Sequence, residues 1–229
     1  MKSTPVFLLL FLSTYLAYTQ VYDESEYSGT NYLEDQFYVG IGYNFLLNRP
    51  TDVVQQNLSY NLQVGFIKDF PINERRNIAL GLGLGYATNS YYTNIIATET
   101  PAGVTYAISN EDGFRRSKFE THAIEIPFEF RWRTSTDIEY RFWRIYTGVK
   151  LAYVFSGNSK LVLENETTSF QNDDLQELQY GLTLNFGFNT WNVSLYYGLN
   201  PLLEDDVFLD NGKSLEMQVF RVGVMFYIL

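Results

Sequence analysis

Apolar side chains alternate with small or polar ones in eight separate stretches of this 229-residue chain. A period of two is that of a β-strand, because successive side chains point to opposite faces of a sheet. None of the stretches shows the 3.6-residue period of an amphipathic helix. The predicted strands are 36–46, 57–68, 77–87, 118–133, 141–156, 177–189, 191–200 and 215–229. The sequence therefore predicts a single all-β domain over residues 36–229.

The positions between the apolar ones indicate which face of the sheet meets lipid. Eleven of the 16 glycines fall inside the predicted strands, and all eleven share these positions with Asn, Gln and charged side chains. A soluble barrel would have to bury the bulky Leu, Phe, Tyr and Trp of the other face in a centre too narrow for them. The reverse arrangement fits, with small and polar residues inside and the bulky face against acyl chains. An open edge in hydrocarbon would leave backbone groups unpaired, so we expect the sheet to close.

The connections between the predicted strands alternate in length. Long connections include 91–117 and 157–176, whereas Asn189-Thr190 predicts a tight hairpin. All three tryptophans lie beside the short turns, where an interfacial aromatic girdle is expected. Short turns at one end, long loops at the other and an even strand number are typical of bacterial outer-membrane barrels. The predicted fold is an eight-stranded antiparallel up-and-down transmembrane β-barrel.

The first 35 residues differ from the rest of the chain. Residues 1–19 combine Lys2, a short apolar run and small residues before Gln20, which is typical of a cleaved signal peptide. The run is too short to cross about 30 Å of hydrocarbon as a helix. Residues 20–35 are polar and acidic, and we expect a flexible N-terminal tail there. The expected location is the outer membrane of a Gram-negative bacterium.

Composition removes several classes of function. The chain has no cysteine, which excludes disulfides, thiolate metal sites and cysteine nucleophiles. Its formal net charge is −10, which argues against nucleic acid as a partner because phosphate binding needs clustered Lys and Arg. No phosphate-binding loop or zinc-ligand spacing is present. We predict no cofactor, no metal site and no catalytic residue.

Ionisable residues on the inward face are the candidate functional site. They are Glu125, Glu129, Arg131, Arg144, Lys150 and Arg221. A seven-residue turn between the fourth and fifth strands would place Glu125 opposite or diagonal to Lys150, and Glu129 likewise to Arg144. Such pairs could form a proton or ion path, or could stiffen a closed barrel. We favour a structural charge network, because eight strands leave no open channel once side chains fill the centre.

The fourth predicted strand also carries a histidine, two glutamates and a proline that could have a chemical or structural role. His122, the only histidine, lies on the lipid-facing parity, and Ile124 stands where some outer-membrane lipid hydrolases carry a serine. Glu125 and Glu129 could act as an acid/base pair, but their basic neighbours favour salt bridges. Pro127 cannot donate to the strand ladder, so it predicts a bulge or a local break in pairing.

The hairpin of the fourth and fifth strands resembles a known family. Residues 125–135 read EIPFEFRWRTS, and residues 142–148 read FWRIYTG after a short turn. A Glu-x-Pro strand that ends in basic residues and Ser, followed by a Gly-bearing strand, resembles the PorT-type, porin-family outer-membrane β-barrel proteins. The resemblance implies an outer-membrane location, and founding members are associated with type IX protein secretion. It brings no catalytic residues.

The first hypothesis is therefore a non-enzymatic structural or accessory subunit of PorT-like type. Its expected partners are outer-membrane lipid and other cell-envelope or secretion-system proteins. A passive pore, a lipid-modifying enzyme that uses His122 or Glu125, and a soluble ligand-binding barrel are the alternatives. The placement of glycine and polar residues on the inward face argues against the last.

Overall fold

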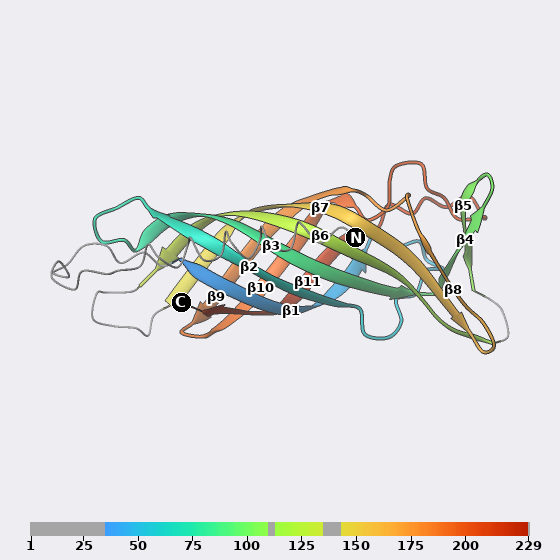
Figure 1. Cartoon of the computed structure of the whole chain (residues 1–229), viewed down its shortest axis with the longest axis horizontal. Helices are drawn as coiled ribbons and strands as arrows, with labels where there is room; N and C mark the ends of the chain where they lie inside the picture. The colour runs from blue at the N-terminus through green and yellow to red at the C-terminus, as the bar shows by residue number, and fades with distance from the viewer. Residues whose placement is uncertain (1–34, 110–112, 135–142, 229) are drawn as a thin grey trace, which may run out of the picture. The chain divides into compact units, whose positions relative to one another are not determined.

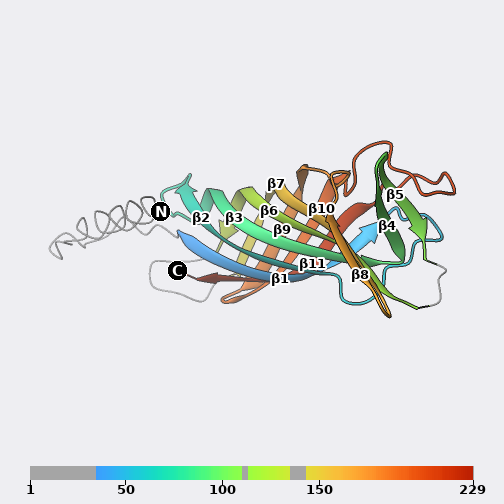
Figure 2. The ribbon, with the colours of Figure 1, turned by 45° about the vertical axis from the view of Figure 1, so that its right-hand side comes forward.

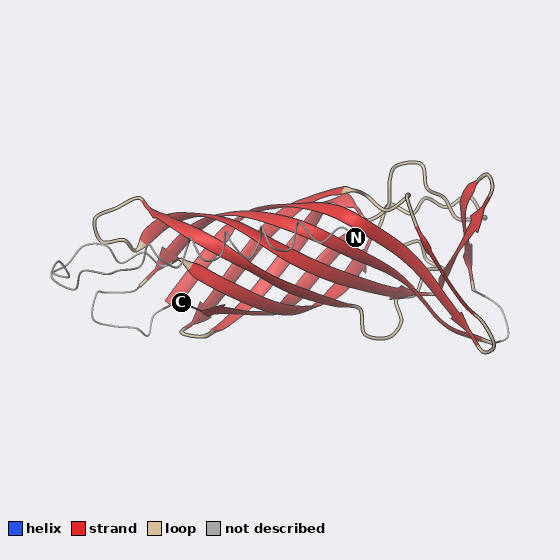
Figure 3. Cartoon of the chain, viewed as in Figure 1, coloured by secondary structure: helices blue, strands red, loops and turns tan. Residues whose placement is uncertain are grey.

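The computed structural model describes residues 35–109, 113–134 and 143–228 (Figure 1). The predicted signal peptide, and the acidic tail up to residue 34, lie outside these residues. The described part consists of strands and loops, as Figure 3 shows. The strands are β1 (Gln36–Leu47), β2 (Tyr60–Pro71), β3 (Ile78–Thr93), β4 (Ile95–Thr100), β5 (Gly103–Ile108), β6 (Phe114–Arg133), β7 (Trp143–Leu163), β8 (Thr167–Gln171), β9 (Leu178–Phe188), β10 (Trp191–Pro201) and β11 (Gln218–Ile228).

Eight of these strands close into a barrel. They pair antiparallel in the order β1-β2-β3-β6-β7-β9-β10-β11, and β11 pairs back with β1. Each of the eight predicted strands corresponds to one of them, so the predicted fold class is confirmed. The two-residue hairpin at Asn189-Thr190 is also present, with Phe188 paired to Trp191. We call the end that carries this hairpin the turn end, and the end with the longer connections the loop end (Figure 2).

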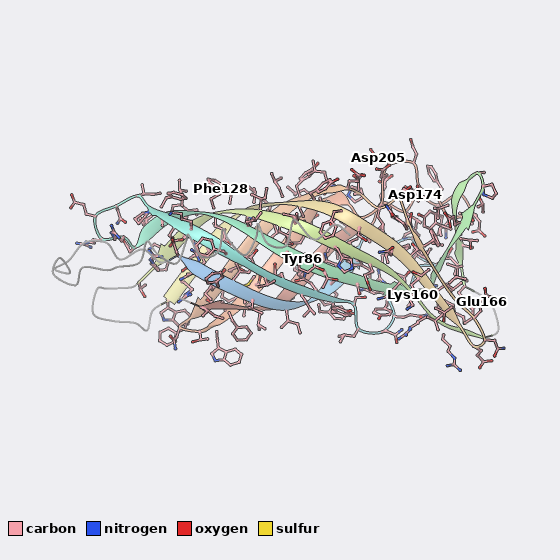
Figure 4. The ribbon with its side chains drawn as sticks, in the orientation of Figure 1. Tyr86, Phe128, Lys160, Glu166, Asp174 and Asp205 are labelled. Carbon is pink, nitrogen blue, oxygen red and sulfur yellow. The ribbon has the colours of Figure 1, made fainter. Side chains whose placement is uncertain are left out.

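The burial of the side chains confirms the predicted faces. Leu82, Phe128 and Leu184 are 49%, 47% and 37% exposed, although they are large and apolar. Their neighbours Glu129 and Asn185 are each only 3% exposed. Figure 4 labels Phe128 on the outer surface of the barrel wall. An apolar belt therefore surrounds a polar interior, which is the packing that a lipid environment requires.

Three strands at the loop end were predicted as loops. β4 and β5 form a separate hairpin within 91–117, and β8 folds back on the end of β7 within 157–176. β3, β6 and β7 also extend further than predicted. Beyond the apolar belt, large apolar side chains occur on the inward face of these strands, and polar or charged side chains occur on the outward face. Tyr91 and Phe119 are fully buried on the inward side, whereas Lys118 lies on the outward side. The alternation used for the prediction holds only where acyl chains cover the outside of the strand.

A β-bulge accompanies this change on β7. His122 pairs with Ser156 but Ala123 pairs with Val154, so Phe155 is the extra residue. The bulge moves the outward positions from odd to even residue numbers, and Gly157 becomes buried. Pro127 carries no bulge. It interrupts the pairing with β3 locally, because Phe128 and Glu125 are paired there and Pro127 is not.

Hydrophobic residues from loops and strand ends form a second core at the loop end, which we call the cap core. It consists of Leu46, Val53, Tyr91, Ile95, Ala97, Tyr106, Phe119, Leu175, Tyr196, Leu202, Leu203, Leu209, Leu215, Met217 and Val219. Five barrel strands contribute inward-facing members, and the β4–β5 hairpin and the loops supply the rest. The cap core therefore lies across the loop end of the barrel interior.

Two glycines make room for a ring that crosses the interior near the turn end. Gly65 and Gly85 pair directly on β2 and β3, and the Tyr38 ring of β1 lies over them. A Cβ added at Gly65 would lie 2.5 Å from the Tyr38 hydroxyl oxygen, and one at Gly85 would lie closer still. Glycine is required at both positions, because an added Cβ would meet the ring and also a backbone carbonyl oxygen, that of Leu84 at 2.6 Å from Gly65 and that of Val64 at 2.9 Å from Gly85.

We expect Gly85→Ala to lower the free energy of unfolding by about 1–3 kcal/mol, the usual cost of overpacking. The same substitution in a Tyr38→Ala background should cost less, because the ring is gone and only the closer approach to the Val64 carbonyl oxygen, at 2.9 Å, is left. Urea titration of the refolded barrel in vesicles measures both values. An equal cost in the two backgrounds would show that the Tyr38 ring is not the reason for glycine.

Candidate functional site

The six candidate residues all point into the barrel. Each of them is at most 6% exposed. They come from β6, β7 and β11, where every second side chain faces inward. The interior places them in two groups, one toward the loop end and one toward the turn end, with Glu129 between.

The group toward the loop end is built around Glu125. Lys150 Nζ lies 2.7 Å from Glu125 Oε2 and donates a second hydrogen bond of 2.7 Å to Gln63 Oε1. The two residues are diagonal neighbours, because Lys150 pairs with Pro127 and Glu125 with Ala152. Arg221 Nη1 lies 3.9 Å from the other oxygen of Glu125. The carboxylate is thus shared by two cations from different strands.

Arg221 is also held by neutral groups. Its Nε donates to Asn44 Oδ1 at 2.9 Å, and its Nη2 donates to Asn89 Oδ1 at 2.7 Å. The guanidinium lies 4.9 Å from the centre of the Tyr196 ring, a cation–π arrangement. Tyr196 belongs to the cap core, so this arginine joins the charged interior to the core that covers it.

The group toward the turn end is built around Asp69. Its two carboxylate oxygens accept hydrogen bonds from Arg131 and Arg133, the latter at 2.6 Å from Arg133 Nη1. Arg131 Nη2 donates to Gln36 Oε1 at 2.6 Å, and its guanidinium stacks 3.9 Å from the centre of the Tyr146 ring. All three charged side chains are at most 1% exposed.

The pairing expected between Glu129 and Arg144 is not found. Glu129 stands opposite Gly148, and Arg144 stands opposite Arg133, because pairing on β7 begins later than a seven-residue turn would allow. Glu129 Oε2 lies 3.5 Å from Nε of Arg131 on its own strand, and Asn185 Nδ2 donates to Oε1 at 3.2 Å. The error in the predicted register of β6 and β7 gave Glu129 the wrong partner, but its side chain points into the barrel as predicted.

Sequence reasoning missed the acidic centre of the second group. Asp69 lies one residue beyond the predicted end of the second strand, and the structure extends β2 to Pro71. It continues the inward series of Asn61 and Gln63, so the parity of that strand would have identified it. Arg133 was quoted only within the resemblance and is equally part of the site.

Between the two charged groups, the described residues enclose little empty space. The cavity between the two groups has a volume of about 10 Å³, which holds about one water molecule. Glu129, Lys150, Asn185 and Arg221 are among its lining residues. Within the described ranges, no three His, Asp or Glu side chains lie close enough together to hold a metal ion. The arrangement can stabilise a closed barrel, and the cavity between its two groups is too small for an organic ligand.

His122 lies outside the barrel, at the loop-end limit of the apolar belt. Its Nδ1 is 2.6 Å from the Tyr86 hydroxyl, and its Nε2 is 3.5 Å from Glu120 Oε1. Figure 4 labels Tyr86 on the barrel wall. The Phe155 ring lies 6.4 Å from the imidazole, centre to centre. Ile124, two residues along, is 43% exposed on the same face and offers no nucleophile.

Polar contacts anchor the cap core above the membrane belt. The Tyr106 hydroxyl donates to Asp174 Oδ2 at 2.9 Å and accepts from Asn172 Nδ2 at 2.9 Å. Burial raises the pKa of Tyr106, so the hydroxyl keeps its proton and its role as donor. On the exposed surface, Lys213 Nζ lies 2.5 Å from Asp52 Oδ2, and this hydrogen bond lowers the pKa of Asp52.

A closed eight-stranded barrel with an apolar outer belt and a filled, charged interior defines an integral outer-membrane β-barrel protein. Residues 19–204 match the family described as outer membrane protein beta-barrel domain, and the chain belongs to that family. Its location is accordingly the bacterial outer membrane. No helix in the described residues has the length and apolar character needed to cross a membrane.

Other comparisons add little. The chain is similar to the crystal structure of Ail, the attachment invasion locus protein of Yersinia pestis, with 13% identity and a TM-score of 0.34. The alignment covers 85% of this chain and 97% of Ail. A search among curated proteins finds no match. The strand pairings and the family carry the assignment of the fold.

Asp69→Asn should lower the free energy of unfolding by about 3–5 kcal/mol, because two buried arginines lose their shared counter-charge. Asp52→Asn removes the same charge from an exposed pair and should change the unfolding curve little. Urea titration of each variant in vesicles, read by tryptophan fluorescence, measures the difference. Similar curves for the two variants would show that the buried pair does not stabilise the barrel.

Proposed function

We propose that the protein is a non-enzymatic structural or accessory subunit of the Gram-negative outer membrane, linked to type IX protein secretion. The filled interior is the observation that carries this proposal. A barrel with room for about one water molecule, and with a hydrophobic core across its loop end, offers its surfaces rather than its interior to other molecules. A passive pore would need the opposite arrangement.

The inward face of β6 supports the PorT-like part of the proposal. Glu125, Pro127, Glu129, Arg131 and Arg133 occupy alternate positions of this strand and share one face. The glutamate, proline and arginine residues of the resemblance that lie on β6 therefore face the charged interior. The side chains of this motif fill the barrel interior. In this proposal the partner-binding surface is therefore outside the motif.

The loop end supplies a surface suited to a protein partner. The β4–β5 hairpin and β8 lie beyond the barrel at this end (Figures 1 and 2). A groove of about 560 Å³ is lined by residues of β4, the end of β7 and β8, with Glu99 and Glu166 among them. Short strands next to a groove are sites where an extended segment of another protein can pair.

A lipid-modifying enzyme is the second candidate. The aligned Tyr86, His122 and Glu120 side chains favour it, since a base held between a hydroxyl and a carboxylate is a recurrent catalytic arrangement. If this candidate holds, His122→Gln should abolish deacylation of lipid A or phospholipid by the purified protein.

Planar-bilayer recordings of the purified barrel should show no stable, sizeable conductance, because side chains fill its interior. A general porin reconstituted in the same way controls for insertion. Stable conductance from the wild-type barrel, absent from protein-free planar bilayers, would favour the passive pore instead.

Deletion of the gene should leave type IX cargo proteins in the periplasm, and the wild-type gene should restore their secretion. A version in which a short Gly-Ser linker replaces residues 95–108 should insert into the membrane yet fail to restore secretion. Normal cargo secretion in the deletion strain would remove the secretion link. It would leave the closed, accessory barrel to be tested by conductance.

A further inference from the structure

Two short strands at the loop end each leave one edge unpaired within the described residues. β8 is the last strand of its sheet and pairs only with β7. β4 pairs only with β5, and the other edge of β5 is partly covered because Tyr106 forms a bridge with Leu209. Neither β4 nor β8 contains the lysine or proline that commonly protects an edge strand. Their outer backbone N–H and C=O groups are therefore open to pairing with another strand.

The groove of about 560 Å³ lies between these two open edges. Its lining includes the consecutive residues 97–99 of β4 and 167–170 of β8. Successive side chains of a strand point to opposite faces, so a run of consecutive lining residues places the groove along the edge of each strand. β7 contributes Leu161 and Leu163, which are two positions apart and therefore share one face. The groove thus has an apolar floor and two strand edges as walls.

Each wall of the groove carries one carboxylate without a counter-charge. Glu99 belongs to β4, and Glu166 directly precedes β8, where Figure 4 labels it at the far limit of the loop end. Both side chains are exposed, and no cation of the described ranges lies within ion-pair distance of either. The described lining residues include no lysine or arginine. A segment with basic side chains would therefore gain two ion pairs in this groove.

A second copy of this chain does not fit the charge of the groove. The open edges that it would offer are the same β4 and β8, which contain no lysine or arginine. Entry of either strand would bring another carboxylate, Glu99 or the adjacent Glu166, to a groove that already holds two. Like charges across a strand pair are destabilising, and each copy carries a formal charge of −10. The charges therefore favour a different, basic protein.

We propose that the groove binds an extended segment of a partner protein in which basic side chains alternate with apolar ones. The segment adds to the open edge of β4 as a third strand, because main-chain hydrogen bonds at a free edge supply affinity and the alternate side chains supply specificity. Its apolar side chains lie on Leu161 and Leu163, and its basic side chains pair with Glu99 and Glu166. This inference rests on the proposal that the groove is the partner-binding surface, and it states the chemistry of the partner.

The experiment titrates the refolded full chain in neutral detergent with a fluorescent peptide of four Lys-Val repeats and follows fluorescence anisotropy. The double variant Glu99→Gln/Glu166→Gln should bind this peptide about ten-fold more weakly, from about three-fold for each exposed ion pair. The same peptide methylated at its backbone nitrogens keeps its charge but cannot donate to a strand edge, so it should bind at least about ten-fold more weakly. A heat-modifiable band on gels verifies that each variant retains its barrel.

The control variant Glu204→Gln/Asp205→Asn removes two exposed carboxylates from the loop before β11, outside the groove lining. It should bind the Lys-Val peptide as the wild type does. An equal loss in both double variants would overturn the site, because net charge alone would explain it. Equal affinity for the methylated peptide would overturn the pairing with a strand edge.

This assay and the secretion assay can fail separately. Peptide binding that depends on Glu99 and Glu166, together with normal cargo secretion in the deletion strain, would retain the groove and remove the secretion role. A secretion defect together with no binding of the Lys-Val peptide would retain the secretion role and overturn the chemistry inferred for the partner.

Discussion

Pairing of the first barrel strand with the last is the constraint on which the rest of the structure depends. β1 and β11 are matched from Phe37 with Ile228 to Leu47 with Gln218, so neither is left with an unpaired edge. In hydrocarbon each unpaired backbone group would cost several kcal/mol. Closure in turn fixes a narrow interior, and every inward side chain has to fit within it. Glycine beside Tyr38 and the charged groups around Asp69 and Glu125 are solutions to that one restriction.

The buried ion pairs of the interior both stabilise the barrel and fill its lumen. Charges that would be costly alone become tolerable when each carboxylate contacts cations from other strands, as Asp69 and Glu125 do. Because these contacts join β2 to β6 and β6 to β7 and β11, they brace the wall across the lumen as well as along it. The same side chains occupy the space that a solute would need.

The alternation of residues was sufficient to predict eight strands, their faces and closure, because lipid outside and a narrow lumen inside leave one consistent arrangement. The pairing of Glu125 with Lys150 could be anticipated from turn length, whereas that of Glu129 could not, since a shift of a few residues exchanges one partner for another. Asp69 was missed because the predicted strand ended at residue 68, one residue too early. β4, β5 and β8 were missed because their environment is water and the cap core, where period-two alternation has no membrane to enforce it.

The extra residue Phe155 in β7 has a consequence for how this wall can change over time. Toward the turn end from Phe155, the outward side chains of the strand are mostly apolar, as in a lipid-facing segment. Toward the loop end, the outward side chains are mostly polar or charged, as in a water-soluble sheet. The β-bulge therefore divides one continuous strand into a lipid-facing segment and a segment whose outward face meets water. Substitutions suited to a new membrane composition and substitutions suited to a new external partner can therefore accumulate independently.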